Sequence, residues 1–508
     1  MGERWERWAL PAILAVAALN FFGQLGSSSY YVDEVLSIEH ALPSLGNVLS
    51  AVRTGETTPW TFFVFLHEWL YRTGSQAEWV TRLPSAVAGV ALVAAVYWMA
   101  GAFLDRRPAL LAAALCALSP LVLEYAQQVR MYAFLMLAVT IAVGATVRAG
   151  SASAGSASAG SASAGSASGA SASARAAAAS PHRTRLLVLG AAAAVLSLWL
   201  HYAAAAVILP LCVWLGTRAN IPWRSRAAFI GACLVAEVLL LPLAKDQYNE
   251  APNGLVGIAG ITWSNVVRIA ETPLDSRVLG GVDVIRLLGV AAVVGSVLIL
   301  ALRGRSAVRS RGLLVTLALL APVAVVILGI AGKDVVLTRY TSVAAPFLIT
   351  AIAAAVAVLP RAGAALPVGA TLVVAGVGLV ASHQRTGFYP PSREVISYIH
   401  AHELPGDVVL TPGAPGTDIP LDYYGQRLLH PLPEFIAASN TTQVNAAIAR
   451  RQRVWYIEEI PNYSFTGATL LGAGSALFRA RGYRAVSART FTATTTFVVL
   501  LATPIRRQ

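Results

Sequence analysis

The sequence predicts a polytopic α-helical membrane protein with about eleven transmembrane helices and a C-terminal extracytoplasmic α/β domain. Of its 508 residues, 56% are hydrophobic and 12% are charged. Soluble domains carry roughly 25% charged residues, so half that value argues against an ordinary soluble enzyme. Apolar runs recur along the chain up to about residue 385, and a different composition follows them.

The transmembrane helices are placed by apolar runs close to the length that crosses a bilayer, about 20 residues. The first run follows Arg4 and Arg7 and lacks a small-residue cleavage site after it, which favours an uncleaved signal anchor. The expected spans are 8–25, 83–104, 108–123, 132–148, 185–200, 203–217, 226–243, 284–302, 312–331, 341–359 and 364–382.

Arginine sets the expected orientation in the plasma membrane. Arginines gather in every second loop, including Arg106, Arg107, Arg303 and Arg305, whereas acidic residues there are few. Because basic residues mark cytoplasmic loops, the N-terminus is predicted inside and the C-terminus outside. The net charge of +13 then reflects topology, and nucleic acid is not an expected partner.

One predicted inner loop, over 149–184, repeats the letters SASAG and is rich in Ser, Ala and Gly. It has no apolar face whose burial could offset the entropy of ordering it. We therefore expect a disordered cytoplasmic insertion within a transmembrane module over 1–385.

Residues 386–508 are expected to form a small soluble α/β domain outside the membrane. The stretch PPSREVISYIHAHELPGDVVLTPG is typical of a capped helix, a Pro-Gly-Asp turn and a short strand. Helix and strand patterns repeat in TTQVNAAIARRQRVWYIEEI, and again from GATLLGAGSALFRARGYRAV to TTTFVVLLAT. This alternation predicts a largely parallel sheet. A Gly-x-Gly-x-x-Gly fingerprint is lacking, so a nucleotide site is not indicated.

Polar residues gather where the predicted spans reach the outer surface, and few lie at the bilayer midplane, where transporters place them. By topology these stretches face one compartment and are expected to surround one cavity. An interfacial phosphate needs cations such as Arg, and an alcohol acceptor needs a carboxylate base, so the pattern favours chemistry on a lipid headgroup. The outer polar residues are Asp33, Glu34, Glu124, Gln127, Gln128, Arg130, Tyr132, His201, Tyr202, Lys245, Asp246, Lys333, Asp334, Arg339 and Tyr340.

Each of these residues, taken singly, has a structural alternative. Arginine and lysine at span ends commonly reach to lipid headgroups, and tyrosines there fit an interfacial aromatic belt. Loop carboxylates such as Asp33 are usually solvated, and no metal-ligand spacing links His67 with His201. Within a span, Glu237 either pairs with a neighbouring helix or has a function of its own.

Several motifs follow one another in an order that is typical of one enzyme superfamily. The first outer loop carries DE; TPWTFFVFLHEWLYRTGSQAEWVTRLPSAVAG, LSPLVLEYAQQVRMYAF and LTRYTSVAAPFLI follow, and the tail carries Gly-Asp-Val-Val-Leu. Together they resemble the GT-C superfamily of polyprenyl-phosphate-sugar glycosyltransferases, in its protein O-mannosyltransferase-like (family 39-like) bacterial branch. One departure is Gln128, where the family often has Glu. The family-like positions of the longest motif are Pro59, His67, Gly74, Arg82, Leu83, Pro84, Ser85 and Gly89.

The resemblance implies a cell-envelope enzyme that moves a sugar from a polyprenyl-phosphate donor to a hydroxyl acceptor on the outer face of the plasma membrane, with inversion. It makes Asp33 the general base and Glu34 its support. Arg130, Arg339 and Lys333 are then the ligands of the donor phosphate. The other expected pocket residues are His67, Arg82, Glu124, Gln128, Tyr132, His201, Tyr202 and Tyr340.

The sugar and the acceptor stay open at this point, and the acceptor is a glycan, a lipid or a protein. Some relatives use a divalent cation, but this sequence has no dense carboxylate cluster, so we assign no metal ligand. Two other functions are weighed: a transporter or flippase of lipid-linked glycans, and a membrane scaffold whose outer domain binds a partner.

Overall fold

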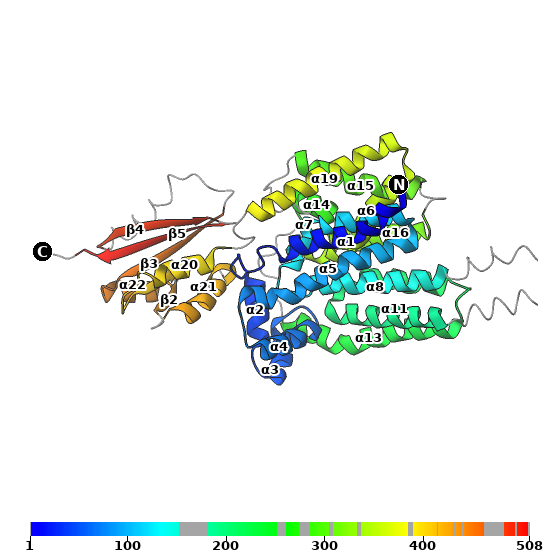
Figure 1. The fold of residues 1–508 in the computed structure, drawn as a ribbon. Coiled ribbons are helices and arrows are strands. Elements are labelled where there is room, and N and C mark those ends of the chain that lie inside the picture. The colour runs from blue at the N-terminus through cyan, green and yellow to red at the C-terminus, as the bar shows by residue number, and fades with distance from the viewer. Residues whose placement is uncertain are drawn as a thin grey trace, which may run out of the picture. The chain divides into compact units, whose positions relative to one another are not determined.

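The computed structural model describes most of the chain and divides into two compact units, which we treat separately (Figure 1). The first unit contains 1–23, 40–73 and 82–380, and the second contains 24–39, 74–81 and 381–508. The described residues are 2–151, 181–250, 261–274, 284–303, 308–332, 337–384, 390–413, 415–429, 433–438, 440–461, 482–492 and 495–505. Most of the Ser/Ala/Gly-rich loop and Lys333 lie outside them.

The first unit is helical. Its apolar helices pack side by side, as Figure 1 shows for α8, α11 and α13. Three helices, α2, α5 and α19, continue from one unit into the other. The helices are α1 (Gly2–Phe22), α2 (Val32–Ala41), α3 (Leu45–Gly55), α4 (Thr61–Thr73), α5 (Glu78–Phe103), α6 (Arg106–Ala117), α7 (Pro120–Ala126), α8 (Tyr132–Ser151), α11 (Pro181–Leu200), α12 (Ala205–Gly216), α13 (Trp223–Glu250), α14 (Trp263–Ala270), α15 (Val284–Arg303), α16 (Arg311–Ile330), α17 (Thr338–Thr341), α18 (Ala345–Val358) and α19 (Arg361–Gln384), with 3-10 turns η1 (Tyr202–Ala204), η2 (Thr272–Leu274) and η4 (Ser342–Ala344).

The number of spans is lower than the sequence predicted, although a helix covers each predicted segment. Among the described residues, eight helices are long and apolar enough to cross a membrane, or nine when one bent pair is counted as a span. The helix α1 does not meet the criterion, and the helix from Tyr202 to Gly216 is too short to meet it alone. The protein is therefore a multi-pass membrane protein, and the count of eleven is not supported.

Small residues let these helices approach one another closely. At Gly190 in α11, an added Cβ atom would lie 2.6 Å from Oγ1 of Thr146 in α8. Close approach of helix backbones replaces the hydrophobic driving force that is missing between helices in lipid. The close packing of α8 and α11 therefore depends on Gly190. The apolar pattern of the sequence predicted these helices but not this contact.

The predicted span 108–123 is broken, which the apolar pattern did not show. The helices α6 and α7 meet at an angle of 57°. Ser119 has extended backbone angles and its side chain accepts a hydrogen bond from the N–H of Val122, with Pro120 at the first position of α7. A residue before proline disfavours the helical conformation, while serine and proline favour a helix start, so the Ser-Pro pair ends one helix and begins the next.

The second unit contains an α/β domain. Its helices are α20 (Ser392–His400), α21 (Pro415–Leu428) and α22 (Thr441–Ala449), and its strands are β1 (Val408–Thr411), β2 (Glu434–Ala437), β3 (Val454–Pro461), β4 (Tyr483–Thr492) and β5 (Thr495–Pro504). The helix, turn and strand predicted for PPSREVISYIHAHELPGDVVLTPG are confirmed as α20, the turn and β1. The predicted helix cap is wrong, because Pro391 precedes α20 and its side chain forms no capping hydrogen bond. The helix expected in GATLLGAGSALFRARG lies outside the described residues.

The sheet is mixed, and the prediction of a largely parallel sheet is wrong for its last strands. The strand order is β2-β1-β3-β5-β4. The strands β2, β1 and β3 pair in parallel, whereas β5 pairs antiparallel with both β3 and β4. Only two residues separate β4 from β5, and so short a connection joins antiparallel strands.

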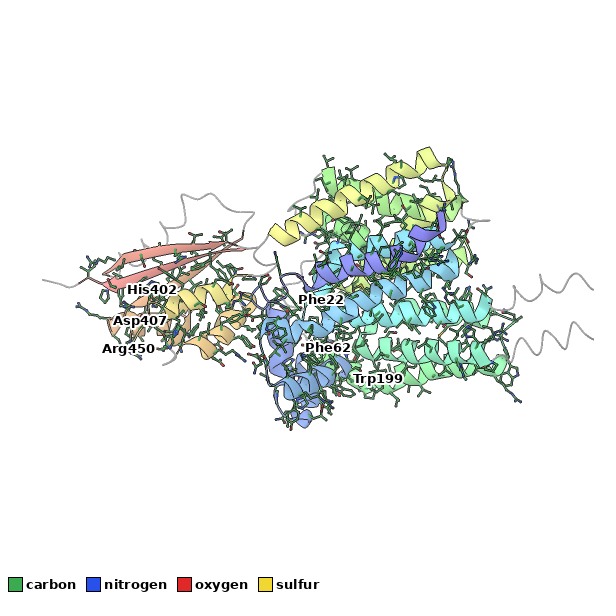
Figure 2. The ribbon with its side chains drawn as sticks, in the orientation of Figure 1. Phe22, Phe62, Trp199, His402, Asp407 and Arg450 are labelled. Atoms are coloured by element: carbon green, nitrogen blue, oxygen red, sulfur yellow. The ribbon has the colours of Figure 1, made fainter. Side chains whose placement is uncertain are left out.

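The Gly-Asp-Val-Val-Leu motif of this domain has a structural role. Gly406 has a φ of +90°, which a residue with a Cβ rarely adopts. Asp407, labelled in Figure 2, is buried and accepts hydrogen bonds from the guanidinium of Arg453 at 2.9 and 2.7 Å and from the indole of Trp455 at 2.8 Å. The motif therefore joins the start of β1 to β3 around a buried carboxylate.

Candidate active site

The turn between α7 and α8 places four predicted site residues close together in the chain. Glu124, Gln128, Arg130 and Tyr132 are all buried. The amide of Gln128 donates a hydrogen bond of 3.1 Å to Oε1 of Glu124, one helical turn earlier. Gln128, which departs from the family pattern, is thus hydrogen-bonded to the carboxylate of Glu124.

Arg130 forms a buried ion pair that the sequence did not suggest. Its Nη1 lies 3.3 Å from Oε1 of Glu56, and both side chains are 7% exposed. Nδ1 of His40 lies 3.4 Å from the same carboxylate oxygen. Burial raises the pKa of Glu56, but the charge of Arg130 and the contact with His40 outweigh burial, so this pKa lies below its ordinary value. Glu56 is therefore ionised and holds the guanidinium.

His201 lies in an aromatic cluster with two other predicted residues. Its ring centroid is 5.7 Å from that of Tyr132 and 5.9 Å from that of Tyr340. The guanidinium of Arg339 lies over the Tyr340 ring at 5.5 Å, and Tyr125 packs on Tyr132 at 4.6 Å. Residues from α7, α8, the α11–η1 junction and α17 thus meet at one place in the first unit.

The pKa of His201 is affected by the charges of both predicted phosphate ligands. Burial lowers the pKa of His201 to about 3; the positive charges of Arg130 and Arg339 act in the same direction, and Glu56 acts against them. We call Glu56, Arg130, His201 and Arg339 the buried charge cluster; Arg339 is half-buried, and the other three residues are buried.

The tautomer of His201 follows from the hydrogen bond of its ring nitrogen Nδ1. Its Nδ1 accepts from the backbone N–H of Ala203 at 3.0 Å, so the proton of the neutral ring is on Nε2. This Nε2 is buried and has no hydrogen-bond partner among the described residues. Since the ring stays neutral above about pH 3, Nε2–H is a permanent donor in the buried charge cluster.

Gln247 is a second residue that the sequence analysis missed. It is 3% exposed, and its amide donates to the carbonyls of Val52 and Thr58 at 2.9 and 2.8 Å. Its Oε1 accepts from the hydroxyl of Tyr202 at 2.8 Å. Gln247 therefore ties the end of α13 to the segment that carries Glu56 and to the residue after His201. A lone glutamine near the end of an apolar run offers no sequence signal for this role.

The remaining predicted pocket residues have local structural partners. Nδ1 of His67, in α4, lies 2.8 Å from the carbonyl of Ala41 at the end of α2. Arg82, in α5, is 2% exposed. These positions show that His67 supports α2, whereas the function of Arg82 stays a prediction.

The acidic pair of the first outer loop forms the first turn of α2, in the second unit. Glu34 is fully buried, and its Oε2 accepts a hydrogen bond of 3.0 Å from the N–H of Tyr31. This contact satisfies a free backbone donor at the start of the helix, as in a capping box. Asp33 is half-buried, and its backbone carbonyl accepts from Ser37 at 2.7 Å. The assignment of Asp33 as the base stays a prediction.

Among the residues that the structure describes, no group of three or more His, Cys, Asp or Glu side chains is arranged to hold a metal ion.

Comparison with known proteins confirms the resemblance. Residues 61–169 match the family model of dolichyl-phosphate-mannose-protein mannosyltransferases, a stretch that includes His67, Arg82, Arg130 and Tyr132. No curated protein matches the sequence. The fold is that of a multi-pass membrane protein, and the family match makes the chain similar to glycosyltransferases that use polyprenyl-phosphate sugars.

Solved structures resemble the chain at the level of fold. ArnT from Cupriavidus metallidurans in the apo state has 13% identity and a TM-score of 0.55, over 96% of this chain and 97% of that one. The same protein bound to undecaprenyl phosphate has 13% identity and a TM-score of 0.53, with 98% of each chain covered. The oligosaccharyltransferase of Archaeoglobus fulgidus, tethered with an acceptor peptide, has 11% identity and a TM-score of 0.51, over 90% of this chain and 69% of that one.

Proposed function

We propose that the protein transfers a sugar from a polyprenyl-phosphate donor to a hydroxyl acceptor at the outer face of the plasma membrane, with inversion at the anomeric carbon. The observation that carries the proposal is the geometry of the buried charge cluster. Arg130 pairs with Glu56 at 3.3 Å, and Arg339 lies over the ring of Tyr340, which is 5.9 Å from that of His201. The family match supports the donor class, because it names a mannosyltransferase that uses a polyprenyl phosphate.

The donor phosphate binds between Arg130 and Arg339. It carries one negative charge as a diester and two after the sugar has left, so positive groups stabilise the transition state more than the bound donor. Glu56 neutralises part of the positive charge of Arg130 and fixes its direction. Nε2–H of His201 donates a hydrogen bond to a phosphate oxygen without ever adding or losing a proton at physiological pH.

Asp33 is the general base in this proposal. Its carboxylate takes the proton of the acceptor hydroxyl while the hydroxyl oxygen forms a bond to the anomeric carbon. The bond from that carbon to the phosphate oxygen breaks, and its electron pair leaves with polyprenyl phosphate. One displacement inverts the configuration. The order of the sequence motifs supports this assignment, because the acidic pair of the first outer loop is Asp33 and Glu34.

An apolar groove of about 240 Å³ in the first unit has room for part of the polyprenyl tail. Side chains from α14, α15, α16 and α18 line it, among them Val266, Val293, Val323 and Leu348. One lining residue, Ile269, belongs to a hydrophobic cluster against which both Val326 and Tyr340 pack. Tyr340 in turn contacts Arg339 and His201.

The proposal is tested with purified protein in lipid vesicles. A panel of polyprenyl-phosphate sugars, from mannose to pentoses, is incubated with glycan, lipid and peptide acceptors, and released polyprenyl phosphate is measured. We expect release with one sugar, loss of at least about 100-fold in Asp33→Asn, and full activity in the control Asp105→Asn, whose side chain is 86% exposed. Normal transfer by Asp33→Asn removes Asp33 from the role of base.

A flippase of lipid-linked glycans is the second candidate, because the break between α6 and α7 is a feature that transporters share. The same vesicles separate the two functions. Movement of labelled lipid-linked sugar between leaflets, without formation of a glycosidic bond, would favour the flippase.

A further inference from the structure

The loop that leads into α2 contacts the α/β domain through a buried tyrosine, Tyr30. Tyr30 is 1% exposed, and its ring stacks on Tyr424 at 6.2 Å and meets Tyr423 edge-on at 5.5 Å. Its backbone N–H donates to the hydroxyl of Tyr424 at 2.8 Å. Its own hydroxyl donates to the carbonyl of Gln76 at 2.8 Å. All these residues belong to the second unit.

Glu78 and Arg393 form the polar centre of the same contact. Oε1 of Glu78 accepts from the hydroxyl of Tyr424 at 2.9 Å and from Nη1 of Arg393 at 2.8 Å. The hydroxyl of Tyr424 thus accepts from the loop and donates to Glu78. Burial lowers the pKa of Arg393, but the charges of Glu78 and Glu394 outweigh burial and raise this pKa above its ordinary value.

The guanidinium of Arg393 also holds the backbone of the loop directly. It donates to the carbonyls of Gly26 at 3.2 Å and Ser27 at 2.9 Å. The hydroxyl of Ser29 accepts from the backbone N–H of Arg393 at 3.1 Å and donates to Glu394 at 2.8 Å. The first turn of α20 therefore binds the loop from residue 26 to residue 29.

This contact ends where α2 begins. Tyr30 is followed by Tyr31, whose N–H is bound by Glu34, and Asp33 lies in the same helical turn. The phenol of Tyr423 has its pKa raised by burial and also by the negative charges of Glu78, Glu39 and Glu34, although Arg427 acts against them. The helix α21 thus lies beside the acidic turn as well as beside Tyr30.

We infer that the α/β domain is a positioning element for the acidic first turn of α2, and that Arg393 and Tyr424 are its positioning residues. The inference rests on the proposed function, in which Asp33 of this turn is the base. The α/β domain then has a function that requires no ligand bound to the domain itself. A base displaced by about 1 Å costs up to roughly 100-fold in rate, so loss of these contacts is expected to lower kcat.

The full-length protein in vesicles provides the test, with Arg393→Gln and Tyr424→Phe as the variants. Tyr424→Phe keeps the ring that stacks on Tyr30 and removes only the hydroxyl. We expect kcat to fall about 10- to 100-fold in each variant, with the KM for the donor changed by less than about threefold. Arg393→Lys keeps the charge next to Glu78 and is expected to recover part of the loss. The matched control is Arg450→Gln, since Arg450 (Figure 2) forms an exposed ion pair with Glu434 in the same domain.

Amide hydrogen exchange gives a readout that does not depend on activity. In Arg393→Gln we expect faster exchange at residues 26–35 and unchanged exchange in β1 and β3. Unchanged exchange at 26–35 overturns the inference. So does unchanged kcat in both variants of an active enzyme. If the wild-type protein transfers no sugar, the proposed function fails by itself, and the exchange experiment still decides whether the domain holds the loop.

Discussion

Glu56 is the residue on which the charge balance of the candidate site depends. It brings one negative charge to a buried group with two arginines and a neutral histidine. An arginine buried without a counter-charge costs several kcal/mol, whereas a pair with good geometry roughly compensates its own desolvation. The pairing therefore keeps Arg130 ionised and directed while the donor phosphate is absent.

Replacing Glu56 with glutamine is expected to weaken both the fold and the site. Glu56→Gln keeps the size of the side chain but leaves Arg130 without its neutralising partner, so we expect a loss of stability of about 3 kcal/mol. Turnover is expected to fall at least about 10-fold, because Arg130 loses its direction. Thermal unfolding in detergent and the release assay measure the two effects. Glu68→Gln is the control, since Glu68 pairs with Arg72 on an exposed face of α4; equal losses in both variants would contradict the role of Glu56.

The pH dependence of His201 gives a second prediction. The pKa of this ring is about 3 in the folded protein and about 6.5 in an unfolded chain. The unfolded state then binds more protons between these values, so this histidine makes the protein less stable as pH falls from 6.5 to 3. Between pH 6.5 and pH 3, we expect the melting temperature of His201→Gln to fall less than that of the wild type.

The activity of the same variant separates the neutral donor from a titrating group. Because His201 stays neutral from pH 5 to 8, the ratio of kcat/KM between wild type and His201→Gln is expected to be constant over that range. A ratio that changes with an inflection near pH 6.5 would show that His201 titrates in the working enzyme.

At the scale of elements, the sequence could predict the helices because hydropathy and length are local properties. It could not predict the break at Ser119, since the apolar residues continue through it. The strand β5 was predicted in TTTFVVLLAT, but its antiparallel direction was not. The strand pattern is the same in both directions, and only the pairing decides the direction. Arg130 and Arg339 were predicted from motifs, and His201 from its place at the outer end of a predicted span. Glu56 and Gln247 are single polar residues that gain their roles only in three dimensions.

Gln247 makes α13 part of the site, and a variant can test this. Gln247→Ala leaves the carbonyls of Val52 and Thr58 without their donor, and each unsatisfied buried group costs about 1 to 3 kcal/mol. We expect a lower melting temperature and reduced turnover, because the segment that holds Glu56 is released. Gln426→Ala is the control, as Gln426 forms an exposed contact with Asp422. A normal melting temperature for Gln247→Ala would contradict this role.

At the scale of the whole molecule, membrane orientation decides on which side of the membrane each loop and the α/β domain lie. Charge asymmetry predicts that the loop near residue 219 is cytoplasmic, whereas α4 and the α/β domain are outside. Sugar transfer at the outer face requires that α4 and the α/β domain lie outside. The opposite orientation would contradict the proposed function. Single cysteines at exposed positions can report this directly, since the native Cys116 and Cys233 are buried and Cys212 is half-buried.

The experiment uses a variant in which these three cysteines are replaced by alanine, with one cysteine then returned at Tyr71, Ala219 or Leu404. Tyr71 is 80% exposed on α4, and Leu404 is 54% exposed beside α20. We expect a membrane-impermeant maleimide to label Tyr71→Cys and Leu404→Cys in intact spheroplasts, and Ala219→Cys only after permeabilisation. The sugar-transfer assay on each variant ensures that the labelled protein is functional. Labelling of Ala219→Cys alone in intact cells would reverse the orientation, and with it the proposal that the sugar is transferred outside.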